Sequence, residues 1–133
     1  MTSDMITHKY LTVNGQSWHW VEAGSGDPVV LLHGIPESWK CWEHQIPKLA
    51  TQFRVIAIDL KGYGQSGKEE GDYSMSKVAE QVVELLDALD ITTFRMAGHD
   101  WGVAIGDNIV SQYSERVESY VRCCLSLHKY DSR

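Results

Sequence analysis

Strands that alternate with helices are the feature of this sequence that most restricts its fold. Short apolar or β-rich runs cover Val29–Leu32, Val55–Ile58 and Thr92–Ala97, and apolar residues at helical spacing lie between them. Strands separated by helices are joined by crossovers, so they lie parallel in one sheet with helices packed against it. The sequence therefore predicts an α/β fold with a mostly parallel sheet and helices on both faces.

Three segments are expected to be helical. Trp39–Leu49 has apolar residues three and four positions apart, although Pro47 lies within it and can end a helix early. Ser74 is placed to cap a second helix whose apolar stripe ends at Leu89. A third helix is predicted from about Val103 to Tyr113.

A β-hairpin is expected before the first of these crossovers. Ile6–Val13 and Gln16–Ala23 have the composition of strands, and Asn14-Gly15 between them is favoured in type I′ turns, where both central residues need positive φ. Trp18 and Trp20 share one face of the second strand, so we expect them to pack in the core.

Charge and cysteine content narrow the classes of function. The 133 residues include 12 Lys and Arg against 18 Asp and Glu, which argues against a nucleic-acid partner. Cys41, Cys123 and Cys124 show no C-x-x-C spacing, so neither a disulfide framework nor a metal site is expected. No signal peptide or membrane-spanning run is recognisable, so the predicted location is cytoplasmic, with no membrane partner.

Two glycine-rich segments are candidates for a functional turn. Gly62–Gly67 matches the G-x-G-x-x-G pattern of dinucleotide sites, but the acids Glu69, Glu70 and Asp72 follow where a phosphate would lie. We therefore expect a surface loop there and no nucleotide cofactor. Gly98–Gly102 lies between a predicted strand and a predicted helix, which is the context that a nucleophile-bearing turn requires.

Asp100 is the central residue of this second segment, Gly-His-Asp-Trp-Gly. A carboxylate on such a turn can attack an electrophilic carbon and become esterified, and the small residues Gly98 and Gly102 let strand and helix approach closely. Aspartate is also a favoured N-cap, so the same residue can simply cap the following helix. The local sequence leaves both interpretations open.

The segment His33-Gly34-Ile35-Pro36 directly follows the first buried strand. Its glycine and proline predict a constrained turn, in which the bond before Pro36 is a candidate cis peptide. We expect His33 to be structural, with its ring bonded to backbone, and not to act as a catalytic base.

Taken together, the motifs resemble the epoxide hydrolase and haloalkane dehalogenase branch of the α/β-hydrolases. The matching motifs are His33–Trp39, Asp59–Ser66 and Gly98–Gly102. They lie in a run from Val29 to about Arg122 that resembles the N-terminal half of an α/β-hydrolase core. Residues 1–133 are therefore expected to form a single partial domain, without the cap domain and the C-terminal half.

This resemblance implies a reaction and roles for individual residues. Asp100 would attack an epoxide carbon and form an ester, and the backbone amides of Ile35 and Trp101 would form the oxyanion hole that stabilises ester hydrolysis. Trp101 and Pro36 would contact the small-molecule substrate. The residues that shape the two turns would be His33, Gly34, Gly98 and Gly102. No cofactor is implied.

Two alternatives stay open beside this assignment. A haloalkane or haloacid dehalogenase would use the same carboxylate against a halide-bearing carbon, and Trp101 is compatible with both reactions. Ile35 departs from the residues usual in either group, which affects pocket shape more than the backbone donor. The third interpretation is a non-catalytic remnant that acts only as a partner of another chain.

The groups that would activate water for ester hydrolysis are not recognisable in the sequence. In the family they follow the cap domain, and neither His128 nor Tyr130 has an identifiable role. We therefore expect the chain to be catalytically incomplete by itself. The apolar run Tyr120–Leu127 predicts a last strand with an unpaired edge, through which the chain is expected to self-associate.

Overall fold

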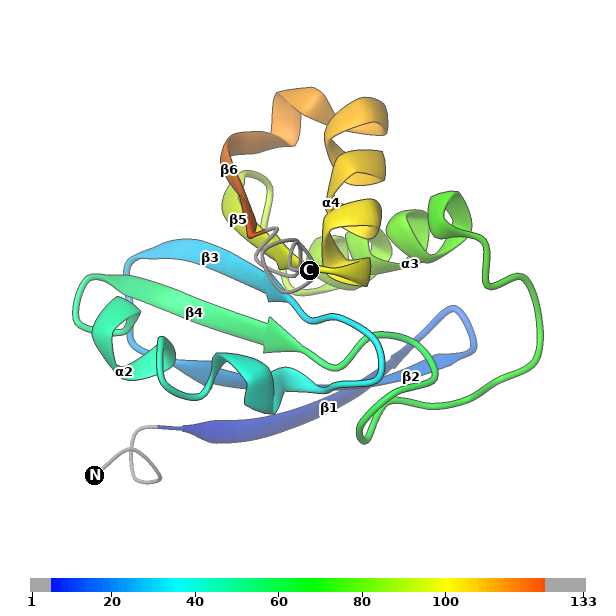
Figure 1. Ribbon diagram of the computed structural model, residues 1–133, viewed down its shortest axis with the longest axis horizontal. Coiled ribbons are helices and arrows are strands. Elements are labelled where there is room, and N and C mark those ends of the chain that lie inside the picture. The colour runs from blue at the N-terminus through cyan, green and yellow to red at the C-terminus, as the bar shows by residue number, and fades with distance from the viewer. Residues whose placement is uncertain (1–5, 124–133) are drawn as a thin grey trace, which may run out of the picture.

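One sheet of six strands forms the centre of the protein within residues 6–123, the part of the chain that the computed structural model describes (Figure 1). The strands are β1 (Thr7–Val13), β2 (Gln16–Ala23), β3 (Asp27–Leu32), β4 (Phe53–Ile58), β5 (Phe94–His99) and β6 (Val117–Cys123). Their order is β1-β2-β4-β3-β5-β6. The last four run parallel, whereas the hairpin of β1 and β2 joins β4 in antiparallel fashion.

Helical segments cover both faces of this sheet. They are η1 (Trp39–Trp42), α2 (Ile46–Leu49), α3 (Met75–Ala88), α4 (Trp101–Gln112) and η2 (Ser114–Arg116). Side chains of α3 and α4 pack with Val30 and Ile56 on one face, and those of η1 and α2 pack with Val29 and Val55 on the other (Figure 1). Successive residues of a strand point to opposite faces, so each buried strand serves both cores. The predicted α/β class is confirmed.

Several local predictions are confirmed as well. Asn14 and Gly15 have φ values of 50° and 84°, as the hairpin turn requires. Trp18 and Trp20 are 1% and 2% exposed and belong to the core between the sheet and α3. Ser74 caps α3 through its side chain.

The continuous helix predicted over residues 39–49 is wrong. The segment forms two short pieces, because η1 ends at Trp42 and α2 begins only at Ile46. Pro47 occupies the first turn of α2, where its missing N–H is not needed, so it helps to begin a new helix instead of continuing the previous one. Both pieces still bury apolar side chains against the sheet.

Two strand predictions are correct in place but shifted in extent. β5 continues past Ala97 to His99, and β6 begins at Val117, before the predicted start at Tyr120. Residues 124–127 of that predicted strand lie outside the described residues, as does Cys124. Within residues 6–123, no helix has the length and apolar character needed to cross a membrane.

Candidate active site

Asp100 lies on a sharp turn between β5 and α4. Its backbone has φ 58° and ψ −116°, a conformation that costs a non-glycine residue about 1–3 kcal/mol. Strand and helix are in close contact here: a Cβ at Gly98 would lie 2.6 Å from the Gly102 carbonyl oxygen, and a Cβ at Gly102 would lie 2.2 Å from that of Leu32. The prediction that Asp100 occupies a strand-to-helix turn with positive φ is confirmed.

The turn that follows β3 lies directly against Asp100. The Ile35 amide donates a hydrogen bond to Asp100 Oδ2 at 3.2 Å, and a Cβ at Gly34 would lie 2.5 Å from the Asp100 Cβ. The Asp100 side chain accepts no capping hydrogen bond from α4. Asp100 is thus the N-cap residue of α4 by position, but its side chain does not cap the helix, and its exposed carboxylate accepts from the Ile35 amide instead.

Trp101 and Pro36 are the other two residues that the sequence placed near the carboxylate. Trp101 begins α4, and its half-buried ring packs edgewise on Tyr63 with ring centroids 5.6 Å apart. Pro36 is exposed and follows a cis peptide bond from Ile35. Of the two amides predicted to converge on Asp100, only that of Ile35 reaches the carboxylate, and the Trp101 amide makes no hydrogen bond to it.

His33 has the structural role that the sequence predicts. It is fully buried, and the Leu60 amide donates a hydrogen bond to its Nε2 at 2.9 Å. Because Nε2 accepts, the ring proton resides on Nδ1, which donates to the Gly34 carbonyl oxygen at 2.7 Å. Burial lowers the pKa of His33, so the neutral ring ties the turn after β3 to the loop after β4.

This geometry predicts that acid destabilises the protein through His33. The unfolded state takes up a proton near pH 6.5, whereas the folded state takes it up only at lower pH, because burial depresses the pKa. The contribution of the neutral His33 ring to the free energy of unfolding is complete above about pH 6.5. It decreases as the pH falls below this value, by at most about 1.4 kcal/mol per pH unit. Urea unfolding at several pH values measures this slope. A His33→Gln variant should be less stable at neutral pH but show a shallower slope, and an unchanged slope would contradict the assignment.

A buried network around Asp59, which the sequence analysis did not identify, holds the adjoining loops. Asp59 accepts hydrogen bonds from the amides of Trp39 at 2.8 Å and Gln65 at 2.9 Å. Its Oδ2 also lies 2.6 Å from Nδ1 of the buried His19. The motif at residues 59–66 was the available signal for Asp59, whereas no sequence signal pointed to His19, which β2 brings from a distant part of the chain.

No described histidine is bonded to Asp100. Within residues 6–123, the ring of His33 is held by backbone on both sides, and that of His99 is directed to Glu37 at 3.1 Å. His128 and Tyr130 lie outside the described residues. The described part of the chain therefore presents a carboxylate with one amide donor beside it, and no base in contact with either.

The fold and this turn define the class of protein: an α/β protein with a carboxylate on a strained turn at the carboxyl end of its parallel strands. Ligands of open α/β sheets bind at this edge. Residues 27–132 match the family model of the alpha/beta hydrolase fold, and the chain belongs to this family.

Relatives and solved structures agree with the resemblance to epoxide hydrolases. Bifunctional epoxide hydrolase 2 of Mus musculus is 44% identical over 118 residues, covering 86% of this chain and 21% of its own length. Soluble epoxide hydrolase of Corynebacterium sp. (strain C12) is 46% identical over 103 residues, covering 77% and 36%. The structure of the epoxide hydrolase CorEH without ligand superposes with a TM-score of 0.86 at 41% identity, covering 88% of this chain and 41% of that one. The chain thus spans less than half the length of these relatives.

Proposed function

We propose that this chain carries the nucleophile of an epoxide hydrolase-type hydrolase, with Asp100 as the attacking carboxylate. The observation that carries the proposal is the strained, exposed position of Asp100, whose carboxylate accepts a hydrogen bond from the Ile35 amide. A backbone conformation of this cost persists where the surroundings enforce it, and such positions cluster at functional sites. Relatives named as epoxide hydrolases support the same reaction.

The Ile35 hydrogen bond distinguishes the two carboxylate oxygens. Oδ2 accepts from the amide, so Oδ1 is the oxygen left to attack an epoxide carbon. The carbon–oxygen bond of the epoxide then breaks, its electron pair stays on the epoxide oxygen, and that oxygen takes a proton from a donor outside the described residues. The product is an ester in which Oδ2 is the carbonyl oxygen.

The Ile35 amide beside Oδ2 would assist hydrolysis of that ester. Attack of water on the ester carbonyl places negative charge on Oδ2, where the Ile35 N–H already points, and this proximity lowers the barrier. The Trp101 amide, the first of α4, is the second donor we assign, reached by rotation of the Asp100 side chain. Trp101 and Pro36 would contact the substrate beside this carboxylate.

Covalent labelling of Asp100 tests the proposal. We expect the 133-residue chain, incubated with a styrene-type epoxide, to gain the mass of one epoxide on Asp100, as measured by intact-protein and peptide mass spectrometry. Sustained turnover is not expected, because no described histidine can activate water, and a positioned base contributes about 10²–10⁴-fold.

Two variants and one further substrate class make this labelling experiment decisive. Asp100→Asn should take up no label. Asp90→Asn should label normally, because Asp90 is another aspartate with positive φ, at 61°, but lies outside the site. Labelling by a short haloalkane but not by the epoxide would favour the dehalogenase alternative. Absence of labelling by either compound would favour the non-catalytic alternative.

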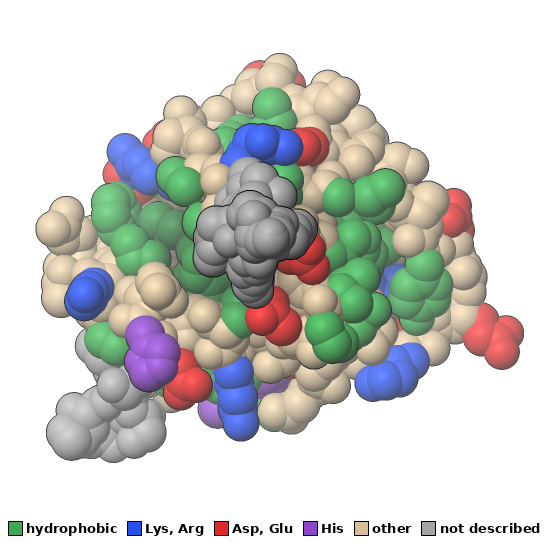
Figure 2. Space-filling view, in the orientation of Figure 1, with side chains coloured by type: hydrophobic (Ala, Val, Ile, Leu, Met, Phe, Trp, Pro, Cys, Tyr) green, Lys and Arg blue, Asp and Glu red, His purple; other side chains and the backbone are tan. Residues whose placement is uncertain are grey.

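We also propose that the chain, produced alone, self-associates through β6. Within residues 6–123, β6 pairs with β5 on one side only, and Val121 on this strand is 59% exposed. The face drawn in Figure 2 carries hydrophobic side chains in several patches with charged groups between them. An edge strand with apolar side chains favours pairing with another chain.

Light scattering over a range of protein concentrations measures this association. Val121→Lys should shift the chain toward the monomer, because a charge on an edge strand opposes pairing. Leu11→Lys is the matched control, because β1 is the opposite edge strand and also exposes apolar side chains. It should leave association unchanged if the chains pair through β6, and a shift to the monomer would instead assign the pairing to β1. A monomer at all concentrations would contradict the proposal.

A further inference from the structure

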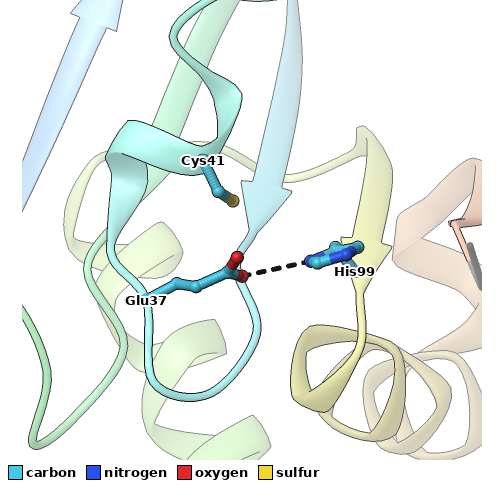
Figure 3. A group of neighbouring side chains, drawn as sticks. All are labelled: Glu37, Cys41 and His99. Carbon is cyan, nitrogen blue, oxygen red and sulfur yellow. Dashed lines mark hydrogen bonds and ion pairs between the residues drawn. The ribbon is translucent and has the colours of Figure 1, made fainter. Parts of the chain in front are cut away.

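Three side chains that can bind a metal ion converge beside the Asp100 turn. Glu37, Cys41 and His99 each direct one ligand atom toward the others, and these atoms all lie within 4.8 Å of one another (Figure 3). His99 Nδ1 and Glu37 Oε1 are only 3.1 Å apart. The three residues come from the loop after β3, from η1 and from the end of β5, so only the folded chain brings them together.

The backbone positions this cluster before any ion is present. Glu37 lies on a tight turn in which its amide donates to the Gly34 carbonyl oxygen at 2.9 Å. Its Oε1 also accepts a hydrogen bond from the Gly34 amide at 3.1 Å. Cys41 is held by η1, whose first turn is capped by Ser38. Such outer contacts fix ligand orientation and reduce the cost of assembling a metal site.

A pocket opens at the cluster. It has a volume of about 250 Å³ and is lined by Cys41, Trp42, Gln45, His99 and Cys123, which leaves room for an ion with a coordinated water. None of the three candidate ligands is fully exposed. Burial raises the pKa of the Cys41 thiol to about 12, so without an ion the thiol keeps its proton.

We propose that Glu37, Cys41 and His99 bind a divalent zinc ion, with water completing a tetrahedral site. Zinc–ligand bonds of about 2.0–2.3 Å place tetrahedral ligand atoms about 3.3–3.8 Å apart, so the observed cluster needs to contract by only about 1 Å. A thiolate and an imidazole favour zinc over magnesium or calcium, which bind oxygen ligands.

The protons and charges of this step balance. The Cys41 thiol releases its proton to the buffer, and the His99 ring shifts its proton from Nδ1 to Nε2, so that Nδ1 can coordinate. The thiolate and the Glu37 carboxylate then neutralise the charge of the ion. A neutral assembly avoids the large cost of a partly buried net charge.

The bound ion would join the loop after β3 to the end of β5. Gly34, which donates to Glu37, also contacts Asp100, and His99 immediately precedes Asp100. Zinc is therefore expected to stabilise the turn that carries the Asp100 carboxylate. Asp100 is not one of the three proposed ligands, and the site does not depend on the reaction assigned to Asp100.

Titration of the full chain with cobalt alone, and then with zinc, tests the site. Cobalt should bind with one-to-one stoichiometry and give a sulfur-to-cobalt charge-transfer absorption band. Zinc should then displace the cobalt, and the band should disappear. Cys41→Ser should lose this band and weaken zinc binding by more than about 100-fold, because loss of an outer-contact residue alone costs about 10–100-fold. Zinc should raise the melting temperature of the native chain, but not that of Cys41→Ser.

Controls separate this site from other metal-binding side chains. A chain with both Cys123→Ser and Cys124→Ser should keep the cobalt band, and His44→Ala, at an exposed histidine on the same segment, should bind normally. Circular dichroism checks that Cys41→Ser is folded, and Glu37→Gln is a second variant that should weaken binding while the thiol remains. The proposal is overturned if Cys41→Ser retains the band, if the folded double variant loses it, or if the native chain binds neither metal.

Discussion

Asp100→Asn is expected to abolish epoxide hydrolysis by the chain once it is assembled with the C-terminal portion of a related epoxide hydrolase. The amide cannot attack a carbon electrophile as a carboxylate does, so no ester forms. Loss of a covalent nucleophile reduces turnover on the order of 10⁴-fold or more. Co-production of the two polypeptides, followed by a multiple-turnover assay with a styrene-type epoxide, measures the effect.

Two comparisons decide what such a result means. Asp90→Asn should leave turnover of the assembled protein unchanged, because Asp90 shares the positive φ of Asp100 but not its contact with Ile35. The Asp100→Asn chain should still assemble with its partner, as size-exclusion chromatography can show. Turnover that persists in an assembled Asp100→Asn protein would contradict the assignment of the nucleophile.

Gly102→Ala is expected to destabilise the protein by about 2–3 kcal/mol. The added Cβ would lie 2.2 Å from the Leu32 carbonyl oxygen and 2.8 Å from that of His33. Leu32 is the last residue of β3, whose backbone the sheet holds in place, and His33 directly follows it, so α4 must move away. Alanine is favoured over glycine in a helix by about 1 kcal/mol, but this gain is smaller than the cost of the overlap. Urea unfolding measures the net change.

Gly106→Ala on the same helix is the matched control. Its Cβ would also overlap a neighbour, at 2.5 Å, but that neighbour is the hydroxyl oxygen at the end of the Tyr120 side chain. A side chain can rotate away, at the cost of its hydrogen bonds to Val103 and Asp107. Gly106→Ala should therefore destabilise the protein less than Gly102→Ala. Equal effects would show that backbone contact at the Asp100 turn is not the limiting constraint.

Local patterns were sufficient for most of the secondary structure. The buried runs and the Asn14-Gly15 turn depend on neighbours in sequence, so they were predictable from side-chain periodicity and turn chemistry. The prediction of one helix over residues 39–49 was wrong because the apolar spacing there fits one continuous helix and two short helices equally well. Pro47 begins a helix as readily as it ends one, and packing against the sheet selected the break.

The local sequence does not decide the role of the Asp100 side chain. The Gly-His-Asp-Trp-Gly motif predicts a strand-to-helix turn, yet a cap and a nucleophile require the same residue type at the same place. In the structure the carboxylate accepts from the Ile35 amide and not from α4. That amide is remote in sequence and reaches Asp100 only because β3 and β5 are neighbours in the sheet.

The sequence by itself determined the α/β class, the hairpin and the position of the Asp100 turn, because each depends on periodicity or on residues adjacent in the chain. Only the tertiary structure decided which amide holds the Asp100 carboxylate and that Glu37, Cys41 and His99 meet. The absence of C-x-x-C spacing predicted no metal site, since spacing reports only ligands that are close in sequence. The physical reason is that the crossover connections of a parallel sheet bring the ends of distant strands to one edge, and spacing along the chain does not record those distances.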